Sequence, residues 1–286
     1  MPEPGFESPT LFDHLDDEPS DPVPMARVAL LVAYDGAPFH GFAVNAGVRT
    51  VGGSLADAIG RVVRHPVELT VAGRTDKGVH AWGNVVSFDA PAERLDVDAL
   101  VGALNKMLQP HIAVRAGAVV ADDFSARFSA VGRTYRYTVL NRAVPDPFLA
   151  DRAWFVEAPL DLAGLRLACD PVIGEHDFTS LCRRPKPKDG SEPVMVRRVR
   201  SASWTDLGDG VLRFEVTANA FCHQMVRSMV GLLVEAGMGV RHAGDISAVL
   251  RAKDRHAAGR LAPPQGLVLW HVDLGGATPD TWPLDP

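Results

Sequence analysis

The sequence predicts an α+β fold of two tandem β-α-β-β-α-β domains with a central antiparallel sheet. Short runs rich in Val, Leu and Ile alternate with stretches whose apolar residues recur at helical spacing. The same order of elements occurs twice along 286 residues, a length that suits two domains. Hydrophobic residues make up 47% and charged residues 22%, as in ordinary globular proteins. Because no apolar run reaches the length of a membrane span, we expect no membrane association.

The first domain is predicted over residues 26–130. It opens with a strand over 28–34, which the turn residues Asp35-Gly36 close. Thr50 is a suitable N-cap for a helix whose apolar stripe starts at Val51. The next elements are a strand over 67–71, a strand over 85–88, a helix over 97–108 and a strand over 112–120.

The second domain is predicted over residues 131–274. Its elements are a strand over 133–141, a helix over 160–168, strands over 194–204 and 211–218, a mostly buried helix over 221–238, a short helix over 246–251 and a strand over 267–274. Gly-Asp-Gly at 208–210 predicts a hairpin between the two middle strands. Apart from one extra helix, this order repeats the first domain and is that of ferredoxin-like domains.

Both ends of the chain have a different composition from the body. Residues 1–25 hold seven acidic residues, no Lys or Arg and several prolines, which predicts a disordered acidic tail. The formal net charge of −6 therefore misleads, because the rest of the chain carries 29 basic and 28 acidic residues. Residues 275–286, rich in Gly and Pro, are predicted to be a loose C-terminal tail.

Basic residues concentrate between Arg183 and Arg200, where seven basic residues face two acidic ones. The candidate RNA contacts in this stretch are Arg183, Arg184, Lys186 and Lys188. Such a segment is either a loop that contacts phosphates or a solvated surface loop, and charge alone leaves both open.

The three cysteines, Cys169, Cys182 and Cys222, are far apart in the sequence. They form neither a zinc-binding pattern nor a disulfide framework, and no secretory signal is visible. A reducing cytoplasm is therefore expected. Phosphate-binding glycine motifs of the Walker and Rossmann types do not occur, so no nucleotide cofactor and no metal are predicted.

The segment from Ala72 to Ala81 contains Gly73-Arg-Thr-Asp-Lys-Gly78, placed directly after a predicted strand. Asp76, flanked by the basic Arg74 and Lys77, is a candidate nucleophile or base. The alternative is a polar turn in which the aspartate caps the backbone.

Two further candidates have equally open interpretations. Tyr135 lies between Arg133 and Arg136 on a strand and could stack on a base while the arginines meet phosphates, or it could be a packed cross-strand aromatic. Arg227 lies on the apolar helix over 221–238, where it either extends to solvent or pairs with a buried carboxylate such as Asp76.

Several motifs occur together and in order. They are Tyr34-Asp35-Gly36, Ala72-Gly-Arg-Thr-Asp-Lys-Gly-Val-His-Ala81, Phe124-Ser-Ala-Arg127, Arg133-Thr-Tyr-Arg-Tyr137, Gly174-Glu-His-Asp-Phe178, Phe221-x-x-x-Met-Val-Arg227-x-x-x-Gly231 and Ala262-Pro-Pro-Gln-Gly-Leu-Val-Leu269. With them the chain resembles the bacterial tRNA pseudouridine synthase A family over about residues 27–274. It departs from the family pattern at Gly41–Asn45, Gly52 and Lys77.

The resemblance implies a fold and a reaction. Two α+β domains of the pseudouridine synthase fold would meet at a catalytic cleft and isomerise uridines at positions 38, 39 and 40 of the tRNA anticodon stem–loop. Asp76 would be the catalytic aspartate, Arg74 would help to extrude the nucleotide, and Tyr135 would stack on the flipped uracil. Arg227 would pair with Asp76 and keep it charged. Leu267 and Leu269 would line the pocket.

The resemblance also implies a homodimer that needs no cofactor. Two alternatives remain: a pseudouridine synthase that acts on a different RNA, and a noncatalytic RNA-binding protein. The noncatalytic alternative predicts that Asp76→Asn changes nothing except stability.

Overall fold

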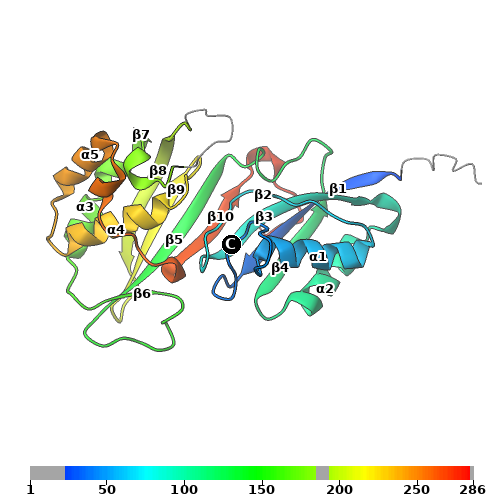
Figure 1. The fold of residues 1–286 in the computed structure, drawn as a ribbon, viewed down its shortest axis with the longest axis horizontal. Coiled ribbons are helices and arrows are strands. Elements are labelled where there is room, and N and C mark those ends of the chain that lie inside the picture. Colours follow the sequence, from blue (N-terminus) through cyan, green and yellow to red (C-terminus); the bar gives the residue numbers. More distant parts are fainter. Residues whose placement is uncertain (1–22, 185–192, 284–286) are drawn as a thin grey trace, which may run out of the picture.

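The computed structural model describes residues 23–184 and 193–283, which form one mixed sheet of ten strands with helices packed against it (Figure 1). Its main path runs β4-β1-β3-β10-β5-β9-β8-β7, with β2 beside β3 and β6 beside β5. The predicted α+β class is confirmed. The sheet is not purely antiparallel, because β10 pairs with β3 and β6 pairs with β5 in parallel.

The first half follows the predicted order of elements. Its elements are β1 (Met25–Tyr34), α1 (Val51–Val63), β2 (Thr70–Val71), β3 (His80–Pro91), α2 (Val97–Leu108) and β4 (Ile112–Val119). Thr50 caps α1 as expected, since its side chain accepts a hydrogen bond from the Gly53 N–H. The four strands lie side by side in the order β4-β1-β3-β2, all antiparallel to their neighbours.

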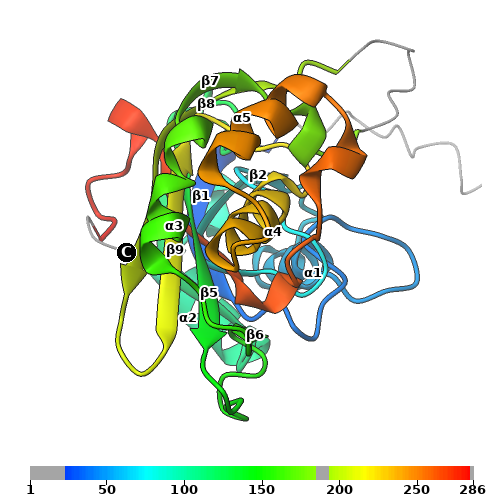
Figure 2. The same cartoon turned by 90° about the vertical axis from the view of Figure 1, so that its left-hand side faces the viewer.

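The second half adds two strands that the sequence did not predict. Its elements are β5 (Gly132–Asn141), β6 (Trp154–Val156), α3 (Leu162–Leu167), β7 (Gly174–Asp177), β8 (Val196–Asp206), β9 (Val211–Ala218), α4 (Met225–Gly237), α5 (Ala243–Ala252) and β10 (Leu267–Asp273). The predicted hairpin of β8 and β9 is present. Viewed from this end, α3, α4 and α5 lie together in front of the strands (Figure 2).

The last strand of the chain joins the two halves. β10 lies between β3 and β5 (Figure 1). In this register Leu269 pairs with Ala81 on one side and with Tyr135 on the other. The two halves therefore share one continuous sheet across the boundary predicted near Ala130. Because of this placement, the C-terminal residues before β10 lie next to the loop that carries Asp76.

Helix α4 is shorter than predicted, because Gln224 adopts a left-handed conformation with φ of 66° and the helix begins only at Met225. Residues 221–224 consequently form a loop at the entrance to the helix. Within α4 only Arg227 and Glu235 are not buried. An arginine on so buried a helix needs a partner. Because Arg227 lies on the first turn, that partner is expected near the loop that precedes α4.

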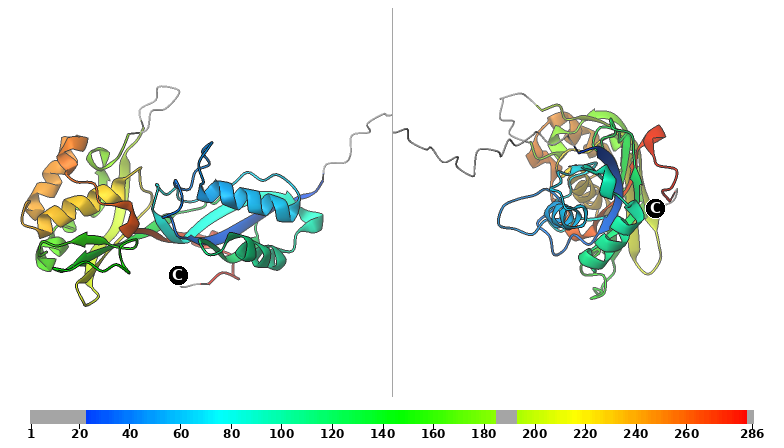
Figure 3. Two further views of the ribbon diagram at one scale, coloured as in Figure 1. Left: turned by 60° about the horizontal axis from the view of Figure 1, so that its bottom comes forward. Right: turned by 90° about the vertical axis from the view of Figure 1, so that its right-hand side faces the viewer.

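The chain ends are more ordered than predicted where the structure describes them. Met25, assigned to the acidic tail, pairs with Pro91 in the sheet, whereas residues 1–22 and 284–286 lie outside the described residues. The segment up to 283 packs back on the body, with only 5% of Trp282 exposed (Figure 3). Burial of this indole outweighs the local preference of its Gly and Pro neighbours for loose chain.

Candidate active site

A cleft of about 960 Å³ lies between the two halves. The loop that follows β2 forms one wall, and the start of α4 together with residues 219–224 forms the opposite wall. Tyr135 of β5 and Leu267 of β10 also line the cleft. Three of the segments singled out in the sequence thus meet at one place.

Asp76 points across this cleft toward α4. One carboxylate oxygen lies 2.9 Å from Nε2 of His223, and the other accepts a hydrogen bond of 3.2 Å from Nη1 of Arg227. Nε of Arg227 donates to the carbonyl of Ala262 at 2.8 Å, which fixes the guanidinium. Both carboxylate oxygens of Asp76 therefore have partners, and the expected pairing with Arg227 is present. His223 is the second partner.

The backbone around Asp76 is held by a buried polar network. The amide of Asn84 accepts from the N–H of Gly73 and donates to its carbonyl at 2.8 Å. Asn84 also donates to the hydroxyl of Tyr34, which shares a 2.8 Å hydrogen bond with Thr75. Burial raises the pKa of Tyr34 to about 12, although both hydrogen bonds oppose this shift, so the phenol stays protonated. This network of uncharged groups fixes the position of Thr75, the residue before Asp76.

Gly73 is required by a close approach between elements. A Cβ there would lie 2.8 Å from Cδ2 of Leu269. Leu269 is fully buried beneath the loop and does not line the cleft, in contrast to the predicted pocket role. Its position in β10, where it pairs with Ala81, explains the difference: Leu269 supports Gly73 from below, whereas Leu267 reaches the cleft.

Tyr135 lies on the floor of the cleft with 8% of its surface exposed, and its ring meets Phe221 edge-on at 5.0 Å between centroids. Burial is the main cause that raises the pKa of Tyr135 far above its ordinary value. The tyrosine therefore offers a neutral aromatic face to anything that enters the cleft.

Arg133 does not have the phosphate-contacting role considered for it. Its guanidinium donates to the carbonyls of Ala72, Ala130 and Asn219 at 2.9–3.3 Å, and to that of Arg127 at 3.3 Å. It thus ties together three segments that line the cleft. An arginine whose donors are taken up by backbone carbonyls positions those segments and has little capacity left for a ligand.

The predicted basic residues differ in how they relate to the cleft. Arg74 is exposed and lines it, and within residues 23–184 and 193–283 its side chain makes no hydrogen bond or ion pair. Arg183 and Arg184 are exposed, and the Arg183 N–H donates to the carbonyl of His223 at 2.9 Å. Lys186 and Lys188 lie outside the described residues.

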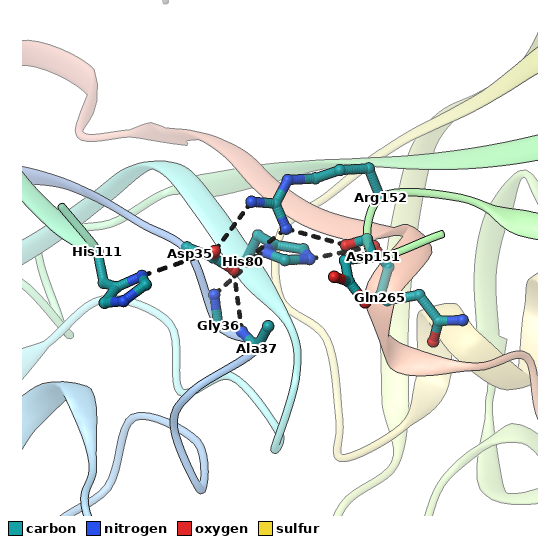
Figure 4. Close-up of polar contacts among 8 residues, drawn as sticks. All are labelled: Asp35, Gly36, Ala37, His80, His111, Asp151, Arg152 and Gln265. Carbon is teal, nitrogen blue, oxygen red and sulfur yellow. Dashed lines mark hydrogen bonds and ion pairs between the residues drawn. The ribbon is translucent and has the colours of Figure 1, made fainter. Parts of the chain in front are cut away.

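A second polar cluster connects the two halves behind the loop that carries Asp76 (Figure 4). Arg152 donates through both terminal nitrogens to Asp35, at 2.9 and 3.2 Å. Nδ1 of His80 accepts from the Gly36 N–H at 3.0 Å and lies 3.1 Å from Asp35, while its Nε2 lies 3.1 Å from the carbonyl of Gln265. His80 ends the loop that carries Asp76, so this cluster anchors that loop to three distant segments.

The charges in this cluster shift two pKa values. Burial alone would raise the pKa of Asp35, but the hydrogen bond from Arg152, with smaller contributions from Ala37 and His80, brings it below its ordinary value. Burial, assisted by the charge of Arg152, lowers the pKa of His80. A neutral His80 can donate from Nε2 to Gln265 while Nδ1 accepts from Gly36.

Acidification should therefore destabilise the fold. Between the folded pKa of His80 and its ordinary value of 6.5, the unfolded chain binds a proton that the folded chain does not. The stabilisation is complete above pH 6.5 and is lost as the pH falls, at about 1.4 kcal/mol for each unit of pKa difference. Urea unfolding at pH 7.5 and 5.5 should show a smaller pH dependence for His80→Gln than for the unchanged protein. Equal pH dependence in both would contradict this assignment.

The fold brings Cys182 and Cys222 together, although their positions in the sequence gave no sign of a contact. Their Cα atoms lie 5.7 Å apart. Forty residues separate them in the sequence, so spacing could not reveal a contact made by the fold. Cys222 lines the cleft next to His223, whereas Cys169 is free and buried.

The described residues contain no cluster of three or more His, Cys, Asp or Glu side chains arranged to hold a metal ion. No helix among residues 23–184 and 193–283 has both the length and the apolar character to span a membrane.

Two solved structures show distant likenesses to this chain. A crystal structure of a Cbf5–Nop10–Gar1 complex matches with a TM-score of 0.32 and 13% identity, over 72% of this chain and 45% of that chain. The archaeal box H/ACA sRNP Nop10–Cbf5 complex matches with a TM-score of 0.34 and 12% identity, over 83% and 58%. Scores at this level support no argument about this chain.

Comparison of sequences is far more specific. The family model described as tRNA pseudouridine synthase matches residues 168–273. The tRNA pseudouridine synthase A of Bacillus velezensis is 40% identical over 86% of this chain and 98% of its own length. That of Bacillus subtilis is 38% identical over 86% and 98%, and that of Cereibacter sphaeroides is 38% identical over 92% and 99%. The chain belongs to the tRNA pseudouridine synthase A family.

Proposed function

We propose that this tRNA pseudouridine synthase uses Asp76 to isomerise uridines at positions 38, 39 and 40 of the anticodon stem–loop. The observation that carries the proposal is the placement of Asp76: it faces the cleft from a rigid loop, with Arg227 and His223 on its two oxygens. Family membership supports the substrate class and the reaction.

The reaction requires little from the protein besides a carboxylate and a shaped site. The N1–C1′ bond of the uridine breaks, a C5–C1′ bond forms, C5 loses its proton and N1 gains one, so the product is an isomer. A carboxylate can attack without a base to activate it. Arg227 compensates the charge of this carboxylate inside the cleft.

The neighbours of Asp76 support the roles that the family implies. Arg74, exposed at the cleft without a protein partner among the described residues, suits a side chain that helps to hold the nucleotide out of the stem–loop. Tyr135 offers a neutral ring for stacking on uracil, and Leu267 provides apolar wall. We assign Leu269 to support of Gly73 instead of contact with the base.

Three broader assignments belong to the same proposal. The strand orders β4-β1-β3-β2 and β10-β5-β9-β8 support two fused ferredoxin-like units around the cleft. The resemblance to the family supports a homodimer, which light scattering at working concentration would test. A tRNA substrate favours the cytoplasm, where the Cys182–Cys222 pair would meet reducing conditions.

The basic segment that starts at Arg183 should contact phosphates of the tRNA. We expect tRNA affinity to fall steeply with salt, because each contact between a basic side chain and a phosphate releases counterions. The double variant Arg183→Gln, Arg184→Gln should reduce the slope of log affinity against log salt by about 1 to 2. Fluorescence titrations at several salt concentrations measure this slope, and an unchanged slope would assign the two arginines to solvated surface.

The position of modification tests the proposal directly. Unmodified tRNA transcripts with a single anticodon-arm uridine, at position 38, 39 or 40, should each acquire one pseudouridine when product positions are mapped by carbodiimide modification and reverse transcription. Products only at other positions, or only in another RNA, would favour the alternative of a synthase with a different substrate.

A further inference from the structure

Exposed apolar side chains gather at the rim of the catalytic cleft. Phe128, Val131 and Val194 all line it, although Phe128 is 79% exposed and Val194 is 73% exposed. An aromatic ring left in water at the mouth of a functional cleft indicates a contact made only with a partner. Tyr135 is already buried on the floor of the same cleft, so Phe128 provides a second and separate aromatic surface.

The exposure of Phe128 does not come from a loosely attached loop. Arg133 binds the carbonyls of Arg127 and Ala130 on either side of it. The Ser129 N–H donates to the carbonyl of Ser125 at 2.8 Å, and the side chain of Ser129 accepts from the Ser125 N–H. The segment is thus fixed to the same arginine that holds Ala72 at the start of the catalytic loop.

A cation accompanies the exposed ring. The guanidinium of Arg127 lies 5.1 Å from the ring centroid of Phe128, and both side chains are exposed. An aromatic face beside a cation is the combination with which proteins bind unpaired nucleotides, since the ring stacks on the base and the cation meets the phosphate. A peptide partner would also use an aromatic ring, but the nearby Arg74 makes this rim cationic and favours a polyanion.

We propose that Phe128 and Arg127 form a base-stacking subsite for an unpaired nucleotide that flanks the modified uridine. The flanking base stacks on Phe128 at the rim, while the target uridine occupies the floor beside Tyr135 and Asp76. Arg127 contacts the phosphate next to the stacked base. This inference rests on the proposed function, because it places a second nucleotide of the same tRNA.

The test combines protein variants with a change in the RNA. Phe128→Ala should weaken binding of an unmodified tRNA transcript about 5- to 150-fold, the range that stacking of one base provides. Phe128→Trp should retain affinity. Phe148→Ala is the matched control: Phe148 is 92% exposed and does not line the cleft, so its loss should change affinity less than about twofold. Unchanged thermal unfolding midpoints would show that the variants fold.

Transcripts with a single abasic site at each nucleotide flanking the target complete the test. At one flanking position the abasic site should lower the affinity of the unchanged protein. The same abasic site should lower the affinity of Phe128→Ala only slightly, because the two changes remove the same contact. Wild-type affinity in Phe128→Ala, or losses that simply add at every flanking position, would overturn the subsite. Absence of tritium release from C5-labelled uridine would instead contradict the proposed function. Failure of the subsite and failure of the proposed function are therefore distinguishable.

Discussion

Asp76→Asn should abolish pseudouridine formation while leaving tRNA binding nearly intact. The amide has the shape of the carboxylate but is not a nucleophile, so the rate of a single turnover should fall roughly ten-thousand-fold or more. Arg227 and His223 would face a neutral side chain, and the Asn84 and Tyr34 network would still hold the loop. Rapid-quench assays with enzyme in excess measure the chemical step, and filter binding measures affinity.

A carboxylate outside the cleft provides the control for this variant. Asp89 on β3 pairs with Arg27 on β1. Asp89→Asn should leave the single-turnover rate unchanged. If Asp76→Asn retained activity, or lost it only in proportion to unfolded protein, Asp76 would be a structural residue. The noncatalytic alternative predicts instead that neither the unchanged protein nor Asp76→Asn forms pseudouridine.

Gly231→Ala should produce the largest loss of stability among single-methyl additions. A Cβ on Gly231 would lie 1.7 Å from the carbonyl oxygen of Arg260, and backbone cannot rotate away as a side chain does. The helix and the segment 260–262 must therefore separate, at a cost of about 3 kcal/mol or more. Activity should fall as well, because the carbonyl of Ala262 in that segment accepts from Nε of Arg227, and Nη1 of the same guanidinium donates to Asp76.

Gly102→Ala is the matched control, since both glycines lie inside helices and nothing lies within 4 Å of a Cβ at Gly102. It should be neutral or stabilise by about 1 kcal/mol through helix propensity. Urea unfolding and the tritium assay together check both variants. A Gly231→Ala protein with normal stability and activity would show that the close packing of α4 on residues 260–262 is not needed.

Local patterns in the sequence were enough to predict most elements and the residues with chemistry. Thr50 predicted a helix start, Gly-Asp-Gly predicted the hairpin, and the glycines around Asp76 predicted a tight charged loop. These signals are local, because capping and turn chemistry act over a few residues. The resemblance then supplied roles that spacing alone left open.

Long-range contacts could not be predicted in the same way. Asn84 lies inside a strand where nothing in the sequence marks it as the residue that holds Gly73. The function of Arg133 as a backbone clamp, the pairing of Cys182 with Cys222 and the burial of Leu269 depend on β10 and α4 being placed beside the catalytic loop. Arg133 and Ala72 are more than 60 positions apart along the chain, and Gly73 and Leu269 are nearly 200 positions apart. Such separations exceed the reach of any local pattern.

The most direct test of the central claim is tritium release from an unmodified tRNA transcript labelled at C5 of uridine. Exchange of N1 for C5 at C1′ must expel the C5 hydrogen of each modified uridine. We expect the tritium released to equal in moles the pseudouridine formed, and we expect no tritium release from a matched transcript with cytidine at positions 38, 39 and 40. No release by folded protein, or equal release from both transcripts, would contradict it.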